Sequence, residues 1–188
     1  MRQRHRHREI GDGQVIAEQV GRRHPDVDVV ILPPDAPDGP DAPVDSAAPA
    51  VDADALNAVA AGLVAAWREV ADLLAELGET DGPGLRWAAR ADGHALVIEK
   101  GVRGLGTDGG GDLLRAVAFR LGERDWRLSA TSRAGRPQLR ATNGLLDFEG
   151  VAGAGATMLT LATGVLRAGV DDRATVRADV AEAVTSWQ

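Results

Sequence analysis

The sequence has no cysteine and no tyrosine, and aromatic residues make up only 3% of its 188 residues. Without cysteine there can be no disulfide bond, thiolate metal ligand or cysteine nucleophile, so zinc-finger and papain-like classes are excluded. With so few aromatic side chains, the core must be built mainly from Leu, Val and Ala. The length is sufficient for one domain of ordinary size that buries its own core.

Lysine is also nearly absent, since Lys100 is the only one and arginine supplies the other basic side chains. Together with the abundance of Ala, Gly, Asp and Val, this composition indicates the codon bias of a high-GC bacterial genome. The formal net charge of −7 argues against a chain dedicated as a whole to nucleic acid binding. No apolar stretch of the secretory kind follows the basic N-terminus, so we expect a cytoplasmic protein.

Composition divides the chain into four parts. Residues 1–12 form a basic arm that we expect to be mobile, and the pattern of 13–34 predicts a short helix followed by a strand. Residues 35–50 are rich in Pro, Ala and Asp and carry no positive charge, as in an extended linker. The globular domain is expected over 51–188.

The strand predicted near the N-terminus belongs to a fragment too small to bury its own apolar surface. Its β-branched side chains alternate along the run "DVDVVIL" at 26–32. We expect this strand to add to a sheet edge, either in this chain or in a partner protein. The residues predicted to make that contact are Val27, Val29 and Ile31.

Four helices are predicted in the main domain. The first shows apolar residues at three- and four-residue steps from Leu56 to Leu77, with Asp52 or Asp54 as its cap and Gly78 as its end. The others are expected over 112–121, 150–166 and 172–187. The uncharged run 150–166 is too short and too rich in Gly and Thr for a membrane span, so we interpret it as a buried helix and expect no membrane contact.

Two hairpins are predicted between the helices. The first is expected to turn at Asp92-Gly93, a dipeptide suited to a type I′ turn. Pairing outward from that turn sets Ala89 opposite Leu96, Trp87 opposite Ile98, and Arg86 opposite Glu99. The second is expected to turn at Ala134-Gly135, so that Trp126, Leu128 and Ala130 lie opposite Asn143, Ala141 and Leu139.

These elements predict an α+β fold with a mainly antiparallel sheet of two hairpins, about four strands in all, covered on one face by helices. The N-terminal region is expected to be disordered or loosely tethered. The element order is similar to that of small α/β secretion-chaperone-like folds, and no sequence motif accompanies this likeness.

A glycine-rich stretch after the first hairpin has the order G-x-G-x-x-G. Gly104, Gly106 and Gly109 supply the pattern, and Gly110 and Asp112 follow. A dinucleotide site would also need a longer helix, a parallel second strand and an acidic residue at its end, and a Walker loop would need Gly-Lys-Ser/Thr. We therefore interpret the stretch as a connection, with anion binding at the helix start as the alternative.

The second hairpin is predicted to carry a polar face rich in arginine. Arg127, Arg133, Arg136 and Arg140 lie on it, where they could meet an acidic partner or a phosphate backbone. The competing interpretation is an ordinary solvated sheet face. The absence of exposed aromatic residues among these arginines disfavours single-stranded nucleic acid.

No catalytic, cofactor or metal constellation is evident. His5 and His7 are close in sequence, but no further ligand completes a metal site. The leading hypothesis is a non-enzymatic protein-interaction module, an adaptor or chaperone-like protein whose partner is another protein or a second copy of itself. The alternatives are a nucleotide- or anion-binding enzyme that uses the stretch 104–112, and a nucleic-acid-associated protein that uses the basic arm and the arginine face.

Overall fold

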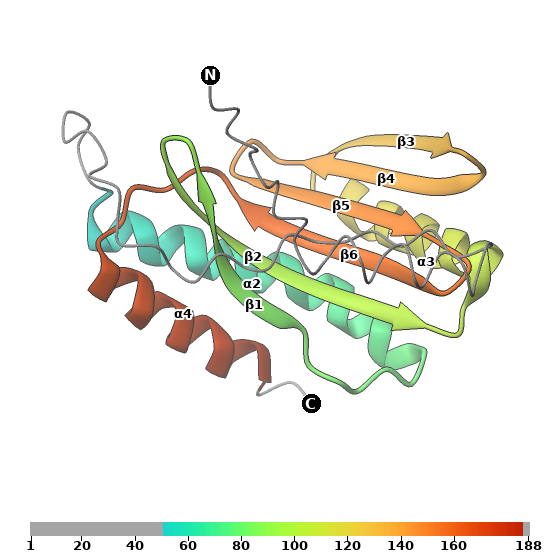
Figure 1. Ribbon diagram of the computed structural model, residues 1–188, viewed down its shortest axis with the longest axis horizontal. Coiled ribbons are helices and arrows are strands. Elements are labelled where there is room, and N and C mark those ends of the chain that lie inside the picture. Colours follow the sequence, from blue (N-terminus) through green and yellow to red (C-terminus); the bar gives the residue numbers. More distant parts are fainter. Residues whose placement is uncertain (1–50, 186–188) are drawn as a thin grey trace, which may run out of the picture. The chain divides into compact units, whose positions relative to one another are not determined.

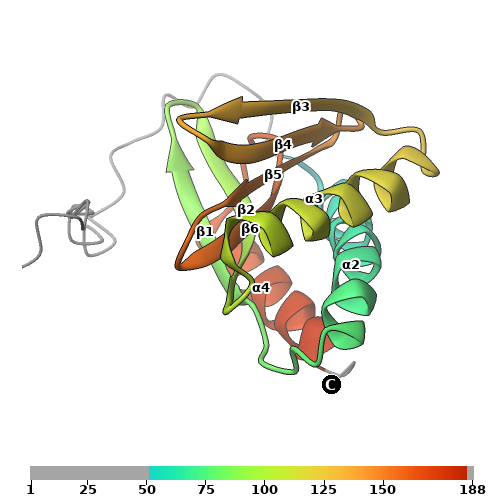
Figure 2. The same cartoon turned by 90° about the vertical axis from the view of Figure 1, so that its right-hand side faces the viewer.

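The structure is a computed structural model that describes residues 51–185. Six antiparallel strands form one open sheet, with the spatial order β1-β2-β6-β5-β4-β3. Three helices cover one face of this sheet and leave the other face open (Figure 1, Figure 2). The elements in chain order are α2 (Ala53–Glu76), β1 (Gly84–Arg90), β2 (Gly93–Arg103), α3 (Gly106–Gly122), β3 (Arg127–Arg133), β4 (Arg136–Thr142), β5 (Leu146–Ala152), β6 (Ala156–Thr163) and α4 (Val170–Thr185).

Helix α2 confirms the prediction for the start of the domain. The side chain of Asp52 caps it by accepting a hydrogen bond of 2.7 Å from the backbone N–H of Ala55. Gly78 follows the helix with φ of 77°, a left-handed conformation that suits glycine. Leu77 was expected on the apolar face, but it lies beyond the helix and is exposed because the chain has already turned away.

The expected buried helix over 150–166 is wrong, because this run forms the end of β5 and all of β6. Side chains on β6 alternate between the covered face and the open face, which is the period of a strand. Gly150 lies close under α3, since a Cβ there would lie 2.3 Å from a terminal methyl group of Leu114, which would have to shift. The glycine and alanine content therefore reflects close contact between helix and sheet, and the sheet has six strands rather than about four.

The first hairpin has a different register from the predicted one. Arg90 pairs with Gly93, so the loop is Ala91-Asp92, and Trp87 lies opposite Leu96. Each partner is displaced by two residues from the expected position, which leaves every side chain on the expected face. Arg86 and Glu99 still meet as an ion pair of 2.7 Å, although they are diagonal rather than opposite.

The second hairpin confirms the predicted pairing. Leu128 lies opposite Ala141 and Ala130 opposite Leu139, around the loop Ala134-Gly135. The C-terminal helix is also confirmed, with Val176, Val180 and Val184 buried in α4. The predicted arm, N-terminal strand and linker all lie outside the described residues.

The core lies between the helices and the covered face of the sheet. Its apolar side chains form one continuous cluster, in which Trp67 of α2 and Phe148 of β5 are the largest fully buried members. A second, small cluster lies on the open face at β1, β2 and β6, and comprises Ala88, Ala95 and Val97 with Ala162 packed against them. The helices thus leave the open face with a small apolar area between polar side chains.

Candidate functional site

The open face of the sheet is the most distinctive surface of the described residues. Every second side chain of each strand projects onto it, and none of the three described helices covers it (Figure 2). Basic side chains outnumber acidic ones on this face, in contrast to the negative charge of the chain as a whole. The arginines are Arg86, Arg90, Arg103, Arg127, Arg133, Arg136 and Arg140, and the carboxylates are Glu99, Asp147 and Glu149.

The structure brings the predicted arginine face together. Arg127 and Arg133 lie at the two ends of β3, and Arg133 stands opposite Arg136 across the hairpin. Arg140 forms an ion pair of 3.0 Å with Glu149 on the neighbouring strand. For the other three arginines, no carboxylate of residues 51–185 lies within ion-pair distance. Three cationic groups are therefore available on this face.

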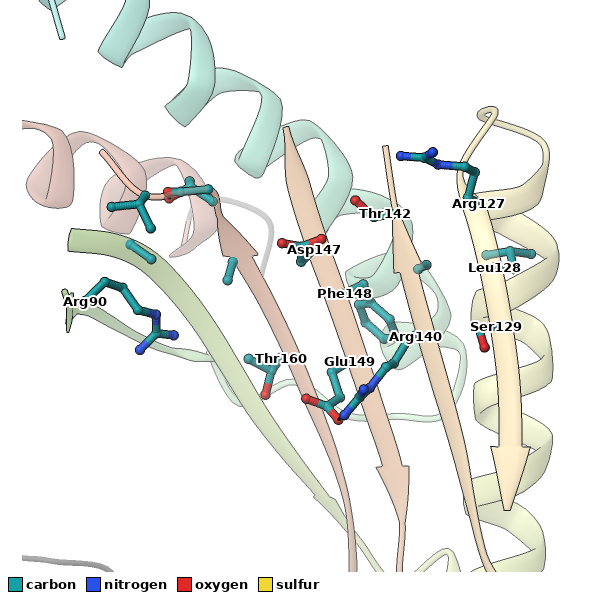
Figure 3. A pocket seen from close by; sticks show the side chains of 16 residues that line it. Arg90, Arg127, Leu128, Ser129, Arg140, Thr142, Asp147, Phe148, Glu149 and Thr160 are labelled. Carbon is teal, nitrogen blue, oxygen red and sulfur yellow. Dashed lines mark hydrogen bonds and ion pairs between the residues drawn. The ribbon is translucent and has the colours of Figure 1, made fainter. Parts of the chain in front are cut away.

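A hollow of about 630 Å³ lies on the same face, at the end of the sheet where β6 finishes and β5 begins. Arg90 from β1 lies on one side of it, and Arg127 and Arg140 lie on the other (Figure 3). Small side chains of Ala95, Ala162 and Thr160 line it between these arginines. The hollow therefore has cationic sides and a floor of small residues.

Two carboxylates also line the hollow. Asp147 lies opposite Thr142 in the sheet, and Glu149 lies opposite its ion-pair partner Arg140. These negative charges divide the cationic sides into separate positions rather than one continuous positive surface (Figure 3).

Sequence reasoning missed Arg90, Asp147 and Glu149 as parts of this site. Both acidic residues lie on β5, just before the region 150–166 that was predicted as a helix. The run "LDFEGVA" of β5 alternates apolar and polar residues, which is the signal that could have identified the strand. Arg90 reaches the site only because β2 pairs with β6, a contact between distant parts of the sequence.

The glycine-rich stretch proposed for anion binding has a different setting. Gly104 and Gly106 have φ of 81° and 64°, and they form the turn between β2 and α3. Gly109, Gly110 and Asp112 lie within α3, which begins six residues before the expected start at 112. A Cβ at Gly110 would collide with Thr157 and Ala152 of the sheet, so this glycine permits close packing of α3. The glycines thus have a structural role, and anion binding stays a prediction.

Residues 51–185 offer little support for a metal site or a membrane-spanning helix. Within residues 51–185, no three His, Asp or Glu side chains come together as metal ligands. None of the described helices combines the length and apolar character needed to cross a bilayer. Lys100 is buried and bonds to the carbonyl oxygen of Asp81 at 2.8 Å and to Glu79 at 3.3 Å, which ties the loop after α2 to the sheet.

No protein-family model, curated protein or solved structure matches this chain. Functional inference therefore depends on the surface itself. The predicted contact residues Val27, Val29 and Ile31 lie outside the described residues.

Proposed function

We propose that this protein is a non-enzymatic protein-interaction module that holds an acidic stretch of a partner protein on the open face of its sheet. The observation that carries the proposal is that Arg127, at one end of β3, and the pair Arg133 and Arg136, at its other end, share the open face and have no ion-pair partner among residues 51–185. Exposed cations without partners attract acidic groups and speed their association. The hollow, which Arg127 lines on one side and Arg90 on the other, gives an extended chain a surface along which to lie.

A protein partner fits this face better than nucleic acid does. Single strands are held largely by aromatic side chains that stack on bases, and the open face has none. Trp67 and Phe148 are buried in the core, and Phe119 is exposed on α3 rather than on the sheet. Adaptor or chaperone-like roles, with a second copy as one form of partner, remain within the proposal.

Binding of the full chain to two labelled polyanions tests this function. The probes are a short polyglutamate and a single-stranded RNA of equal charge, measured by fluorescence anisotropy at several salt concentrations. We expect polyglutamate to bind more tightly. Replacing Arg127, Arg133 and Arg136 by Gln should weaken its binding about tenfold, since each exposed charge contact contributes about 0.2–1 kcal/mol.

The matched control removes the same charge from the helical side of the molecule. Arg68, Arg115 and Arg177 are exposed on α2, α3 and α4, and their replacement by Gln should leave the affinity unchanged. Equal loss in both triple variants would mean that net charge alone drives binding, which contradicts the proposal. Tighter binding of RNA would favour the nucleic-acid alternative.

A further inference from the structure

Strand β3 is an edge strand that the rest of the fold leaves uncovered. All seven of its residues are exposed, on both faces of the sheet. Helix α3 passes beneath β4 and β5 (Figure 2). Leu128, on the covered side of β3, remains 43% exposed. Gly122 of α3 lies next to Leu128, and Phe119 lies one turn before Gly122 on the same helix. The side chain of Phe119 is 68% exposed. The edge therefore presents apolar as well as polar side chains.

The opposite edge of the sheet is protected. Strand β1 packs against α4, and the indole N–H of Trp87 donates to the carbonyl oxygen of Arg173 at 2.9 Å. Natural sheets block free edges with proline, bulges or covering elements. Strand β3 has no proline, and its seven consecutive pairs with β4 contain no bulge. Strand β1 thus has a helix packed against it, whereas β3 is exposed along its whole length.

The backbone groups available at this edge follow from the turn. Ala134 and Gly135 have φ of 51° and 74°, so the hairpin has a type I′ turn in which Arg133 and Arg136 form the closing hydrogen-bonded pair. Hydrogen-bonded pairs alternate along an antiparallel ladder. The backbone N–H and C=O groups that point away from β4 are therefore those of Leu128, Ala130 and Ser132.

The charges at this edge select the partner. Arg127 and Arg133 end the strand on its open face, with Arg136 beside the second. A second copy that paired with β3 over its full length would set Arg127 opposite Arg133 of the other chain, and like charges that face each other destabilise a sheet. An acidic strand would instead place a carboxylate opposite each arginine.

We infer that β3 receives an extended acidic segment of a partner protein as a seventh, antiparallel strand. This inference rests on the proposed function and specifies its binding mode. The segment carries acidic residues opposite Arg127 and Arg133 and apolar residues opposite Leu128 and Ala130. Main-chain hydrogen bonds to the free edge supply affinity, and the side chains supply selectivity.

A designed peptide tests the strand pairing. The probe is a capped seven-residue peptide with aspartate at its first and last positions. Serine occupies the two other positions on the same face of the strand as the aspartates, and valine occupies the three positions on the opposite face. In the inferred register, the valine N–H groups point toward β3 and the serine N–H groups point away. N-methylation of the valines should abolish binding to the full chain, measured by calorimetry, and N-methylation of the serines should leave binding within a few-fold of the parent.

Substitutions in β3 itself test the same pairing between the strand and the peptide. Ala130→Pro removes an outward N–H from an edge strand, where proline is tolerated, and it should abolish peptide binding without unfolding the protein. R127E/R133E should weaken binding at least about tenfold, because two exposed ion pairs are replaced by repulsion. R115E/R177E, with the same charge change on α3 and α4, should bind the peptide as the parent does.

The outcomes separate this inference from the proposed function. If both methylated peptides bind equally, or if polyglutamate binds and the parent peptide does not, strand addition is wrong and the acidic-partner function stands. If neither polyglutamate nor the parent peptide binds, both fail. If circular dichroism shows that the Ala130→Pro variant does not fold, the pair of methylated peptides decides the question by itself.

Discussion

The two predicted hairpins have similar alternating sequences, but they occupy opposite situations in the fold. In β1–β2, the second strand lies between β1 and β6, and its residues Leu96 and Ile98 are fully buried under the helices. In β3–β4, only β4 contributes buried side chains, and β3 is exposed along its whole length. Alternation therefore determines which face a residue joins, and the neighbouring elements determine whether that face is covered. The comparison teaches that the same alternating pattern gives a strand buried in the core in one hairpin and an exposed edge strand in the other.

Truncation of one leucine in each hairpin should show the largest contrast in the free energy of unfolding. Leu96 is 1% exposed in the core, and Leu96→Ala should lower the free energy of unfolding by about 2–5 kcal/mol. Leu128 lies on the exposed edge strand of the second hairpin, and Leu128→Ala should lower the free energy of unfolding by less than about 1 kcal/mol. Urea unfolding followed by tryptophan fluorescence measures both. Equal costs would mean that β3 is covered in solution.

Substitution of one glycine in each hairpin gives the next largest difference. Gly93 has φ of 151° and Gly135 has φ of 74°, so a side chain at either position is strained by about 1–3 kcal/mol. At Gly93 a Cβ would also lie 2.5 Å from the carbonyl oxygen of Leu166, whereas the space around Gly135 is open. Gly93→Ala should therefore cost about 1–3 kcal/mol more than Gly135→Ala, the usual cost of overpacking.

That contact with Leu166 also explains why the register of the first hairpin could not be predicted. The N–H and C=O groups of His94 bond to Leu166 at 2.9 Å and 2.7 Å, and this pairing makes Gly93 part of the strand rather than of the turn. The partners His94 and Leu166 are 72 positions apart in the sequence, so no local signal indicates the contact. The second hairpin has no such contact at its turn among the described residues, and there the Ala134-Gly135 pattern was sufficient.

The same limit applies to the candidate site. The predicted arginines share one face because they lie within one hairpin, where alternation alone places them. Arg90 and Asp147 join them only through the pairing of β2 with β6 and of β5 with β4. Faces within a hairpin could thus be predicted from the sequence, whereas the hollow is formed by pairings between distant strands.

A substitution in the turn of the exposed hairpin should have the smallest effect on stability, and it should stabilise the protein rather than destabilise it. Ala134 has φ of 51°, a left-handed conformation that costs an alanine about 1–2 kcal/mol and that asparagine adopts readily. Ala134→Asn should therefore stabilise the protein by about 0.5–1 kcal/mol, and Ala134→Val should destabilise it because a β-branched side chain suits this conformation least. Thermal unfolding of the three proteins checks the order Asn, Ala, Val. If the Ala134→Asn variant is no more stable than the parent, the turn is not of type I′. The outward-pointing N–H and C=O groups of β3 would then not be those of Leu128, Ala130 and Ser132.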